Sequence, residues 1–192
     1  MNVDWAVAVR PKEGQTISGD VYVVQSFDAH GLLVSVIDGL GGGREAYHAA
    51  QLAAEVLKVH PGYTLSELIR QSHQALHSTR GAVIGIVQFN LVDRTCSFVG
   101  VGNIGVHVYS STSIKPISRN GILGYRLPSL LEMPYRYNSG DTFVLYSDGI
   151  SSRFALEHSL KFDVPPQELA DGILRTYGKT NDDATVMVVR CP

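Results

Sequence analysis

Cysteine, net charge and long hydrophobic runs are all scarce in this chain of 192 residues. Its two cysteines, Cys96 and Cys191, lie in apolar, strand-like contexts, so we expect reduced, buried thiols in a cytoplasmic protein, without a disulfide or a cysteine metal site. No stretch approaches the roughly 18 apolar residues that span a membrane. Residues 1–11 contain Asp4 and Arg10 and lack the apolar core of a signal peptide. The net charge of −2 provides no basic face for nucleic acid or anionic lipid.

The composition is that of an ordinary globular domain. Apolar residues make up 44% of the chain and charged residues 18%, and we find no internal repeat, low-complexity tract or linker. We therefore expect residues 1–192 to form a single domain. We also expect it to be a monomer that binds neither nucleic acid nor membrane.

Acidic residues stand at the ends of four candidate strands. Two apolar runs end in an Asp-Gly pair, and two others begin just after an acidic residue. The residues concerned are Asp20, Asp38-Gly39, Asp148-Gly149 and Asp182-Asp183. Because neighbouring antiparallel strands bring the end of one beside the start of the next, we expect these carboxylates to gather at one edge. Their mutual repulsion would shift their pKa values, and a pair of divalent cations is the expected compensation.

Hydrophobic periodicity divides the chain into strands and helices. We expect strands over residues 3–10, 20–27, 32–37, 82–91, 94–101, 104–109, 133–138, 141–147 and 184–189. We expect helices over 44–60, from a capping box at residues 64–67, over 150–158 and over 165–177. Short connections favour antiparallel pairing, with a meander over 82–109 and a hairpin over 133–147. The expected fold class is an α+β sandwich.

The acidic motifs, in this order, resemble those of the PPM-type (protein phosphatase 2C-like) metal-dependent serine/threonine phosphatases. Within that family the chain is most similar to the bacterial SpoIIE-like branch, and the resemblance covers nearly its whole length. The resemblance implies a four-layer α-β-β-α sandwich, in which helices flank two mainly antiparallel sheets and a metal cleft lies at one edge. Ligation by oxygen atoms alone suits two divalent cations, Mn²⁺ or Mg²⁺, and does not suit zinc.

The resemblance also implies roles for individual residues. Asp38 matches the carboxylate that bridges both cations. Asp20 and the Gly39 carbonyl would hold one cation, and Asp148 and Asp182 the other. Asp183 is the alternative ligand to Asp182, and Asn103 stands near the position of an acidic residue that supplies a third-metal ligand in some relatives.

Two departures from the family pattern bear on the mechanism. Leu40 stands where many eukaryotic members have a histidine proposed as the general acid, so the proton for the leaving oxygen must come from elsewhere. No arginine clearly matches the family's phosphate-binding arginine, for which Arg10 and Arg44 are the candidates.

The implied activity is a phosphoprotein phosphatase reaction. A hydroxide activated by both cations would attack phosphoserine or phosphothreonine in line, with Asp38 and Asp148 as catalytic residues and no phosphoenzyme. The implied substrates are phosphorylated stressosome scaffold and regulator proteins, and the implied role is to reset a bacterial stress-response signal. The alternative function is a catalytically inactive phosphatase-like domain that binds phosphoproteins as a regulatory module.

Other patterns favour structural roles. His73 and His77 have the spacing of a zinc pair, but a third ligand is missing, so we expect surface histidines. Residues 39–43 lack the Gly-x-Gly-x-x-Gly spacing of a dinucleotide-binding turn. Ser147 does not lie in a Gly-x-Ser-x-Gly elbow and is not expected to be a nucleophile. We expect packing roles for Tyr109, Tyr125, Tyr135 and Tyr137.

Overall fold

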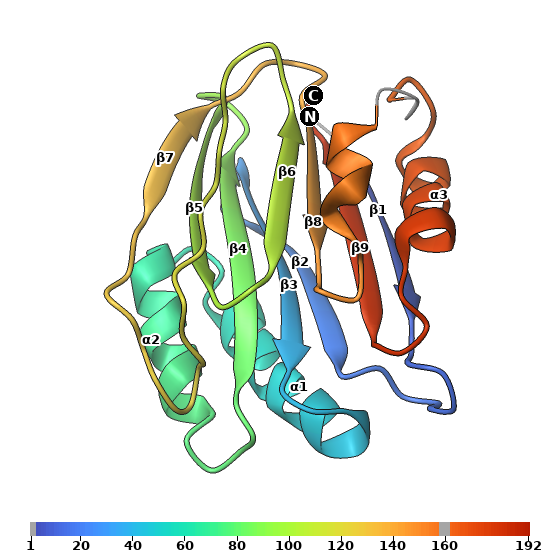
Figure 1. The fold of residues 1–192 in the computed structure, drawn as a ribbon. Helices are drawn as coiled ribbons and strands as arrows, with labels where there is room; N and C mark the ends of the chain where they lie inside the picture. Colours follow the sequence, from blue (N-terminus) through green and yellow to red (C-terminus); the bar gives the residue numbers. More distant parts are fainter. Residues whose placement is uncertain (1–2, 158–161) are drawn as a thin grey trace.

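The computed structural model describes residues 3–157 and 162–192, and it consists of two β-sheets packed between helices (Figure 1). The strand order is β2-β3-β4-β5-β7 in one sheet and β1-β9-β8-β6 in the other, and neighbouring strands are antiparallel. The strands are β1 (Asp4–Arg10), β2 (Asp20–Phe27), β3 (Gly31–Gly39), β4 (Ala82–Asn90), β5 (Thr95–Val101), β6 (Gly105–Tyr109), β7 (Met133–Arg136), β8 (Thr142–Tyr146) and β9 (Ala184–Arg190).

Helices cover the outer face of each sheet. The helices α1 (Gly43–Val59) and α2 (Leu65–Ala75) pack on the five-stranded sheet, and α3 (Pro166–Tyr177) and the short 3₁₀ helix η1 (Ser152–Leu156) pack on the four-stranded sheet. The four-layer α-β-β-α sandwich is thereby confirmed. No helix in the described part of the chain combines the length and apolar content needed to cross a bilayer.

The alternation of side chains along β3 separates two of the three apolar layers. Leu33 and Ile37 belong to the cluster under α1 and α2, whereas Val34 and Val36 belong to the cluster between the sheets. Because successive side chains of a strand point to opposite faces, Asp38 continues the face of Val34 and Val36. The strand therefore carries this carboxylate to the end of the inter-sheet layer.

Local signals account for the helix starts. The Thr64 hydroxyl accepts a hydrogen bond from the Glu67 N–H at 3.3 Å, which confirms the capping box. Pro166 occupies the first turn of α3, where a missing N–H costs nothing. The expected helix over 150–158 is a 3₁₀ helix at Ser152–Leu156, and His158 lies outside the described residues.

Two predicted strand pairings are wrong. The expected meander over 82–109 breaks after β5, because β6 pairs with β8 in the other sheet. The expected hairpin over 133–147 does not form either, since β7 pairs with β5 and β8 lies between β6 and β9. In both places a short connection crosses from one sheet to the other, and the strand pattern alone does not distinguish such a corner from a hairpin.

Candidate active site

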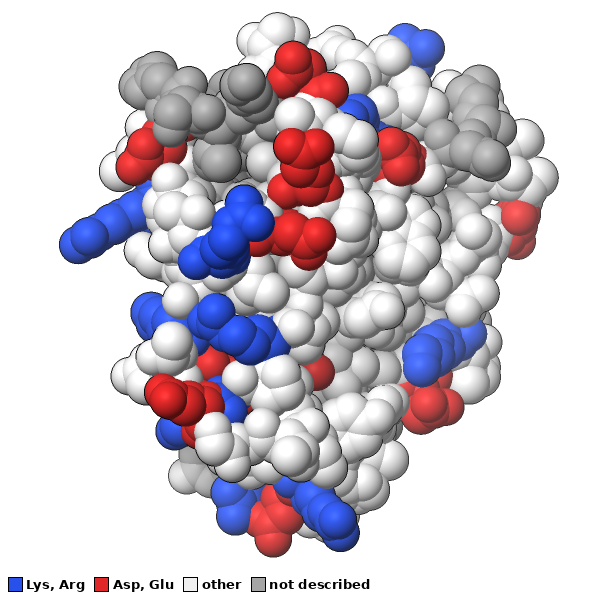
Figure 2. All heavy atoms as spheres, turned by 90° about the vertical axis from the view of Figure 1, so that its right-hand side faces the viewer, with Lys and Arg blue, Asp and Glu red and all other residues white. Residues whose placement is uncertain are grey.

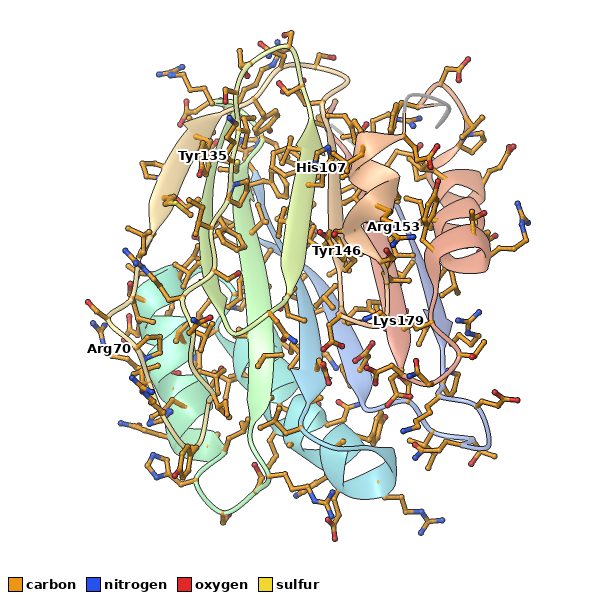
Figure 3. The ribbon with its side chains drawn as sticks, in the orientation of Figure 1. Arg70, His107, Tyr135, Tyr146, Arg153 and Lys179 are labelled. Carbon is orange, nitrogen blue, oxygen red and sulfur yellow. The ribbon has the colours of Figure 1, made fainter. Side chains whose placement is uncertain are left out.

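The carboxylates singled out in the sequence meet at one end of the inter-sheet layer. The β2–β3 register places Asp20 directly opposite Asp38, so both side chains leave the same face of the sheet. Asp148 follows β8, and Asp182 and Asp183 precede its neighbour β9. Each of these four acidic groups raises the pKa of Asp38 electrostatically, which requires that they lie near it. Lys179, which is labelled in Figure 3, lies beside Asp148.

Among the acidic residues of the site, Asp38 has the most strongly shifted pKa. Burial raises its pKa from 3.8 to about 8, with further contributions from the neighbouring carboxylates. This shift disfavours the ionised form of Asp38 when no cation is bound. An ionised Asp38 requires positive charge close by.

Asp20 is buried, with only 5% of its surface exposed. Its Oδ2 accepts a hydrogen bond from the Ser147 hydroxyl at 2.6 Å, and within the described residues its buried Oδ1 has no partner. Burial raises the pKa of Asp20 to about 6, against the lowering effect of Ser147. Ser147 Oγ in turn accepts from the Thr185 N–H at 2.9 Å, so this serine joins β2 to β9 and is not placed as a nucleophile.

Three of the carboxylates open onto a pocket of about 400 Å³. Asp38, Asp148 and Asp182 line it, together with Leu40 and residues 120–122 on other walls. No lysine or arginine is among its lining residues. The pocket is large enough for a phosphoryl group and has an excess of negative charge.

Asp182 and Asp183 have different surroundings. The buried Asp183 accepts the Lys12 N–H and the Gly19 N–H, each at 2.8 Å, through its two carboxylate oxygens. The Asp182 side chain is only partly buried and faces the pocket, and burial followed by the charge of Asp148 raises its pKa. This geometry favours Asp182 as the cation ligand and a structural role for Asp183.

Asn103 lies in contact with a proposed ligand. Its side-chain amide donates to Asp148 Oδ2 at 2.8 Å and so orients that carboxylate. Gly39 is required by close packing, since a Cβ at this position would lie 1.9 Å from the Ala46 carbonyl oxygen of α1. Neither interaction could be read from the acidic motifs alone.

Lys179 is the site residue that the sequence did not indicate. Its side-chain ammonium donates to the Asp148 carbonyl oxygen at 2.6 Å, and its backbone N–H donates to the Gly149 carbonyl oxygen at 2.7 Å. Arg10, a candidate for phosphate binding, donates instead to the Lys179 carbonyl at 2.8 Å. Arg44, the other candidate, lines a separate pocket beside Glu45 and does not line the acidic one. No motif marks Lys179, because it lies 31 residues from Asp148.

The donor set fits divalent cations. The converging groups are carboxylates, an Asp20 oxygen is buried without a partner among the described residues, and the carboxylates repel one another. Over the described ranges, no group of three or more histidine, cysteine, aspartate or glutamate side chains is arranged so that it could hold a metal ion by itself. Bound cations would therefore also draw on backbone carbonyls and water, as hard cations do.

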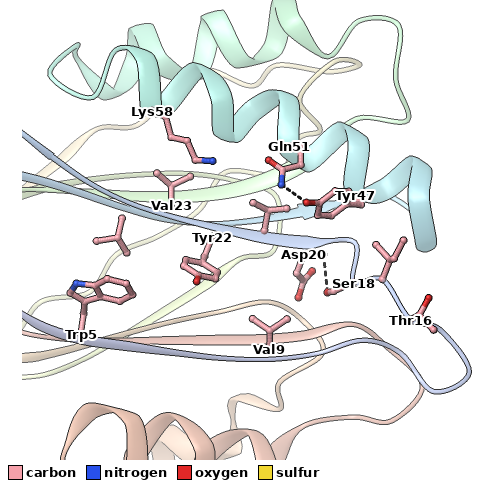
Figure 4. Close-up of a pocket in the computed structure, with 13 residues that line it drawn as sticks. Trp5, Val9, Thr16, Ser18, Asp20, Tyr22, Val23, Tyr47, Gln51 and Lys58 are labelled. Carbon is pink, nitrogen blue, oxygen red and sulfur yellow. Dashed lines mark hydrogen bonds between the residues drawn. The ribbon is translucent and has the colours of Figure 1, made fainter.

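A larger groove of about 770 Å³ lies between the exposed edges of β1 and β2 (Figure 4). Its lining is largely apolar and aromatic, including Trp5, Val9 and Tyr22, and only Asp20 connects it with the acidic cluster. Figure 2 shows lysines and arginines interspersed with acidic residues on one face of the molecule, without an extended basic patch on that face. The acidic pocket, and not this groove, is therefore the candidate active site.

The chain has relatives among known proteins. The family described as Stage II sporulation protein E (SpoIIE) matches residues 28–192. The chain is 25% identical over 179 residues to phosphoserine phosphatase RsbX of Bacillus subtilis (strain 168), covering 92% of this chain and 89% of that protein. A chain from a structural study of the bacterial stressosome matches with a TM-score of 0.93 and 31% identity over 99% of this chain and 100% of that chain. A crystal structure of RsbX in complex with magnesium has a TM-score of 0.87 at 23% identity, over 99% and 96% of the two chains, and supports the fold.

Proposed function

The chain belongs to the SpoIIE family of PP2C-type protein phosphatases. We propose that residues 1–192 form one cytoplasmic, monomeric phosphatase domain that acts on phosphoserine and phosphothreonine. The proposed substrates are phosphorylated stressosome scaffold and regulator proteins. The similarity to phosphoserine phosphatase RsbX and to the stressosome-associated chain supports this choice. The free, buried thiols of Cys96 and Cys191 agree with a reducing compartment.

The observation that carries the proposal is the cluster of carboxylates, none of which forms an ion pair with a residue that the structure describes. Burial and repulsion raise the pKa of Asp38 to about 8 and that of Asp20 to about 6. Such groups persist at functional sites because binding of their ligand compensates the cost. We assign Asp38 as the bridge between two Mn²⁺ or Mg²⁺ ions, Asp20 and the Gly39 carbonyl to one ion, and Asp148 and Asp182 to the other.

When bound, two such cations supply charge neutralisation for the phosphoryl oxygens and activation of water near neutral pH. The protein holds the ligands in place: Ser147 fixes Asp20, Asn103 fixes Asp148, and Asp183 ties residues 12 and 19 to the start of β9. In the net reaction the oxygen of water joins phosphorus and that water gives up one proton, while the bond between phosphorus and the serine oxygen breaks and the freed serine oxygen takes up a proton. Leu40 has no proton to donate, so that proton must come from a source other than this position.

The test is phosphate release from a phosphorylated stressosome scaffold protein with Mn²⁺, with Mg²⁺ and with chelator. We expect cation-dependent release that Asp38→Asn abolishes. Asp171→Asn, an exposed change on α3, should leave release unchanged. If the wild-type protein binds the phosphoprotein and releases no phosphate with either cation, the alternative function as a binding module is correct.

A further inference from the structure

A short turn beside the acidic pocket presents an aromatic ring and two arginine side chains to solvent. We propose that residues 119–126, called here the 119–126 turn, form the docking surface for the phosphorylated partner protein. Tyr125 is its apolar contact, and Arg119 and Arg126 are its charged contacts. This inference rests on the proposed function and specifies which part of the partner the enzyme recognises around the phosphorylated residue.

The turn is continuous with the pocket wall. Residues 120–122 line the acidic pocket. The Tyr125 N–H donates to the Ile122 carbonyl at 3.2 Å, and the Arg126 N–H donates to the same oxygen at 2.8 Å. The Ile122 N–H donates to the Arg126 carbonyl at 2.9 Å, which closes the turn. Tyr125 therefore stands at the tip of a closed turn that begins in the pocket wall.

Three separate elements hold the turn in place. Leu123 is fully buried and exchanges two backbone hydrogen bonds with Ala82 at the start of β4. The Arg119 backbone is bonded to Gly100 and Gly102 at the end of β5, at 2.9 and 2.8 Å. The Gly124 N–H donates to His73 Nδ1 of α2 at 3.0 Å, which gives this histidine a structural role. A surface fixed in this way loses little conformational entropy when a partner binds.

Tyr125 does not pack as the sequence suggested. It is 83% exposed, whereas Tyr135 and Tyr137 are at least partly buried and donate their hydroxyl groups to backbone carbonyls. Single exposed apolar residues are common on protein surfaces and mean little by themselves. An aromatic ring on a rigid backbone beside an active-site pocket is different, because tyrosine is among the residues that dominate binding energy at interfaces.

The charges of the turn complement those of the pocket. Arg119 and Arg126 are exposed, and neither forms an ion pair with any residue that the structure describes. The adjacent pocket is lined by three carboxylates and no lysine or arginine. A segment whose phosphorylated serine enters the pocket would thus meet positive charge immediately outside it. The partner that fits has an apolar side chain for the Tyr125 ring and carboxylates for the two arginines near the phosphoserine.

The experiment compares two phosphoserine peptides of equal length, one with leucine and glutamate flanking the phosphoserine and one with glycine at those positions. Hydrolysis of p-nitrophenyl phosphate reports the phosphatase activity independently of peptide sequence. The variants are Tyr125→Ala, Tyr125→Phe and Arg126→Gln. Tyr63→Ala is the matched control, because Tyr63 is also an exposed tyrosine and lies near Gln88, about 20 Å along β4 from Ala82.

We expect the wild type and the Tyr63→Ala control to prefer the leucine/glutamate peptide by about five- to thirty-fold in kcat/KM. Tyr125→Ala should reduce this ratio to near one, Arg126→Gln should reduce it in part, and Tyr125→Phe should retain it. A Tyr125→Ala variant with the wild-type ratio overturns the docking surface while p-nitrophenyl phosphate hydrolysis leaves the phosphatase assignment intact. If no substrate is hydrolysed, the proposed function fails, and peptide binding decides this inference: equal affinity in wild type and Tyr125→Ala overturns it, and weakened binding supports it.

Discussion

Replacing Asp38 by asparagine should stabilise the cation-free protein at neutral pH, although it removes a proposed metal ligand. Burial and neighbouring carboxylates raise the pKa of Asp38 from 3.8 to about 8. Each unit corresponds to about 1.4 kcal/mol, so the whole shift is about 6 kcal/mol. Because the remaining carboxylates titrate with Asp38, we expect the variant to regain about 2–3 kcal/mol at pH 7. For a domain of this size, that raises the Tm by about 5–10 °C.

The sign of the pH dependence follows from the direction of the shift. The folded-state pKa of Asp38 lies above the unfolded-state value, so the folded protein holds a proton that the unfolded chain releases between about pH 4 and pH 8. The stability that depends on this proton is present below pH 4 and is lost as the pH rises toward 8. The advantage of Asp38→Asn should therefore be small near pH 4 and largest at pH 8. Asp20, whose pKa is raised to about 6, adds its own pH dependence of stability below pH 6 in both the wild type and the variant.

The assay is thermal unfolding in chelator from pH 5 to pH 8.5, with Asp171→Asn as an exposed control on α3. Added Mn²⁺ should reverse the order, because saturating cation at a thousandfold excess over Kd stabilises the wild type by about 4 kcal/mol. A lower midpoint for Asp38→Asn than for wild type at pH 7.5 in chelator would refute the reasoning. The reasoning would be refuted equally if the unfolding midpoint of Asp38→Asn depended on pH in the same way as that of the wild type.

Three further tests address separate parts of the site. Asp148→Asn should abolish Mn²⁺-dependent phosphate release while circular dichroism shows a native fold; near-normal turnover would show that Asp148 is not a ligand. Asp183→Ala should cost about 3 kcal/mol in urea unfolding, because it removes the acceptor of the buried Gly19 N–H and of the part-buried Lys12 N–H, whereas Asp182→Asn should cost less than about 1 kcal/mol; equal costs would contradict the distinction. Lys179→Met should weaken Mn²⁺ affinity several-fold by calorimetry, since the bond that fixes the Asp148 carbonyl is lost, and Lys179→Arg should restore it. A rise in affinity in Lys179→Met would mean that the lysine acts only through its charge.

The sequence was sufficient to predict the sandwich and the meeting of its carboxylates. Strand ends marked by Asp20, Asp38, Asp148 and Asp182 are local features, and antiparallel pairing of the strands brings them together. The strand partners of β6 and β7 were not predictable in this way, since residues 102–104 connect two sheets through a link as short as a hairpin. Whether a short link turns within a sheet or between sheets depends on which apolar faces meet.

Contacts between distant segments escaped prediction for a related reason. Lys179 reaches Asp148 only because Gly178 forms a bridge with Ile150 after α3. Tyr125 looked like a packing residue, yet its neighbours Leu123 and Gly124 make the internal contacts of that turn and leave the ring exposed. Composition and spacing give the type of each residue and its place in a strand or helix. They do not give the direction of a side chain on an irregular loop.

The groups that hold the carboxylates explain why the cluster keeps its charge. The Ser147 hydroxyl holds Asp20, the Asn103 amide holds Asp148, and backbone N–H groups hold Asp182 and Asp183. All these donors are neutral, and the ion pairs of the described residues, Lys58–Glu55 and Arg80–Glu45, lie elsewhere. Lys179 binds the carbonyl of Asp148 and not its carboxylate. Neutral donors orient a carboxylate without cancelling its charge, whereas arginine or lysine partners would form closed ion pairs. The fold thus fixes the positions of the acidic groups and leaves their negative charge available for cations.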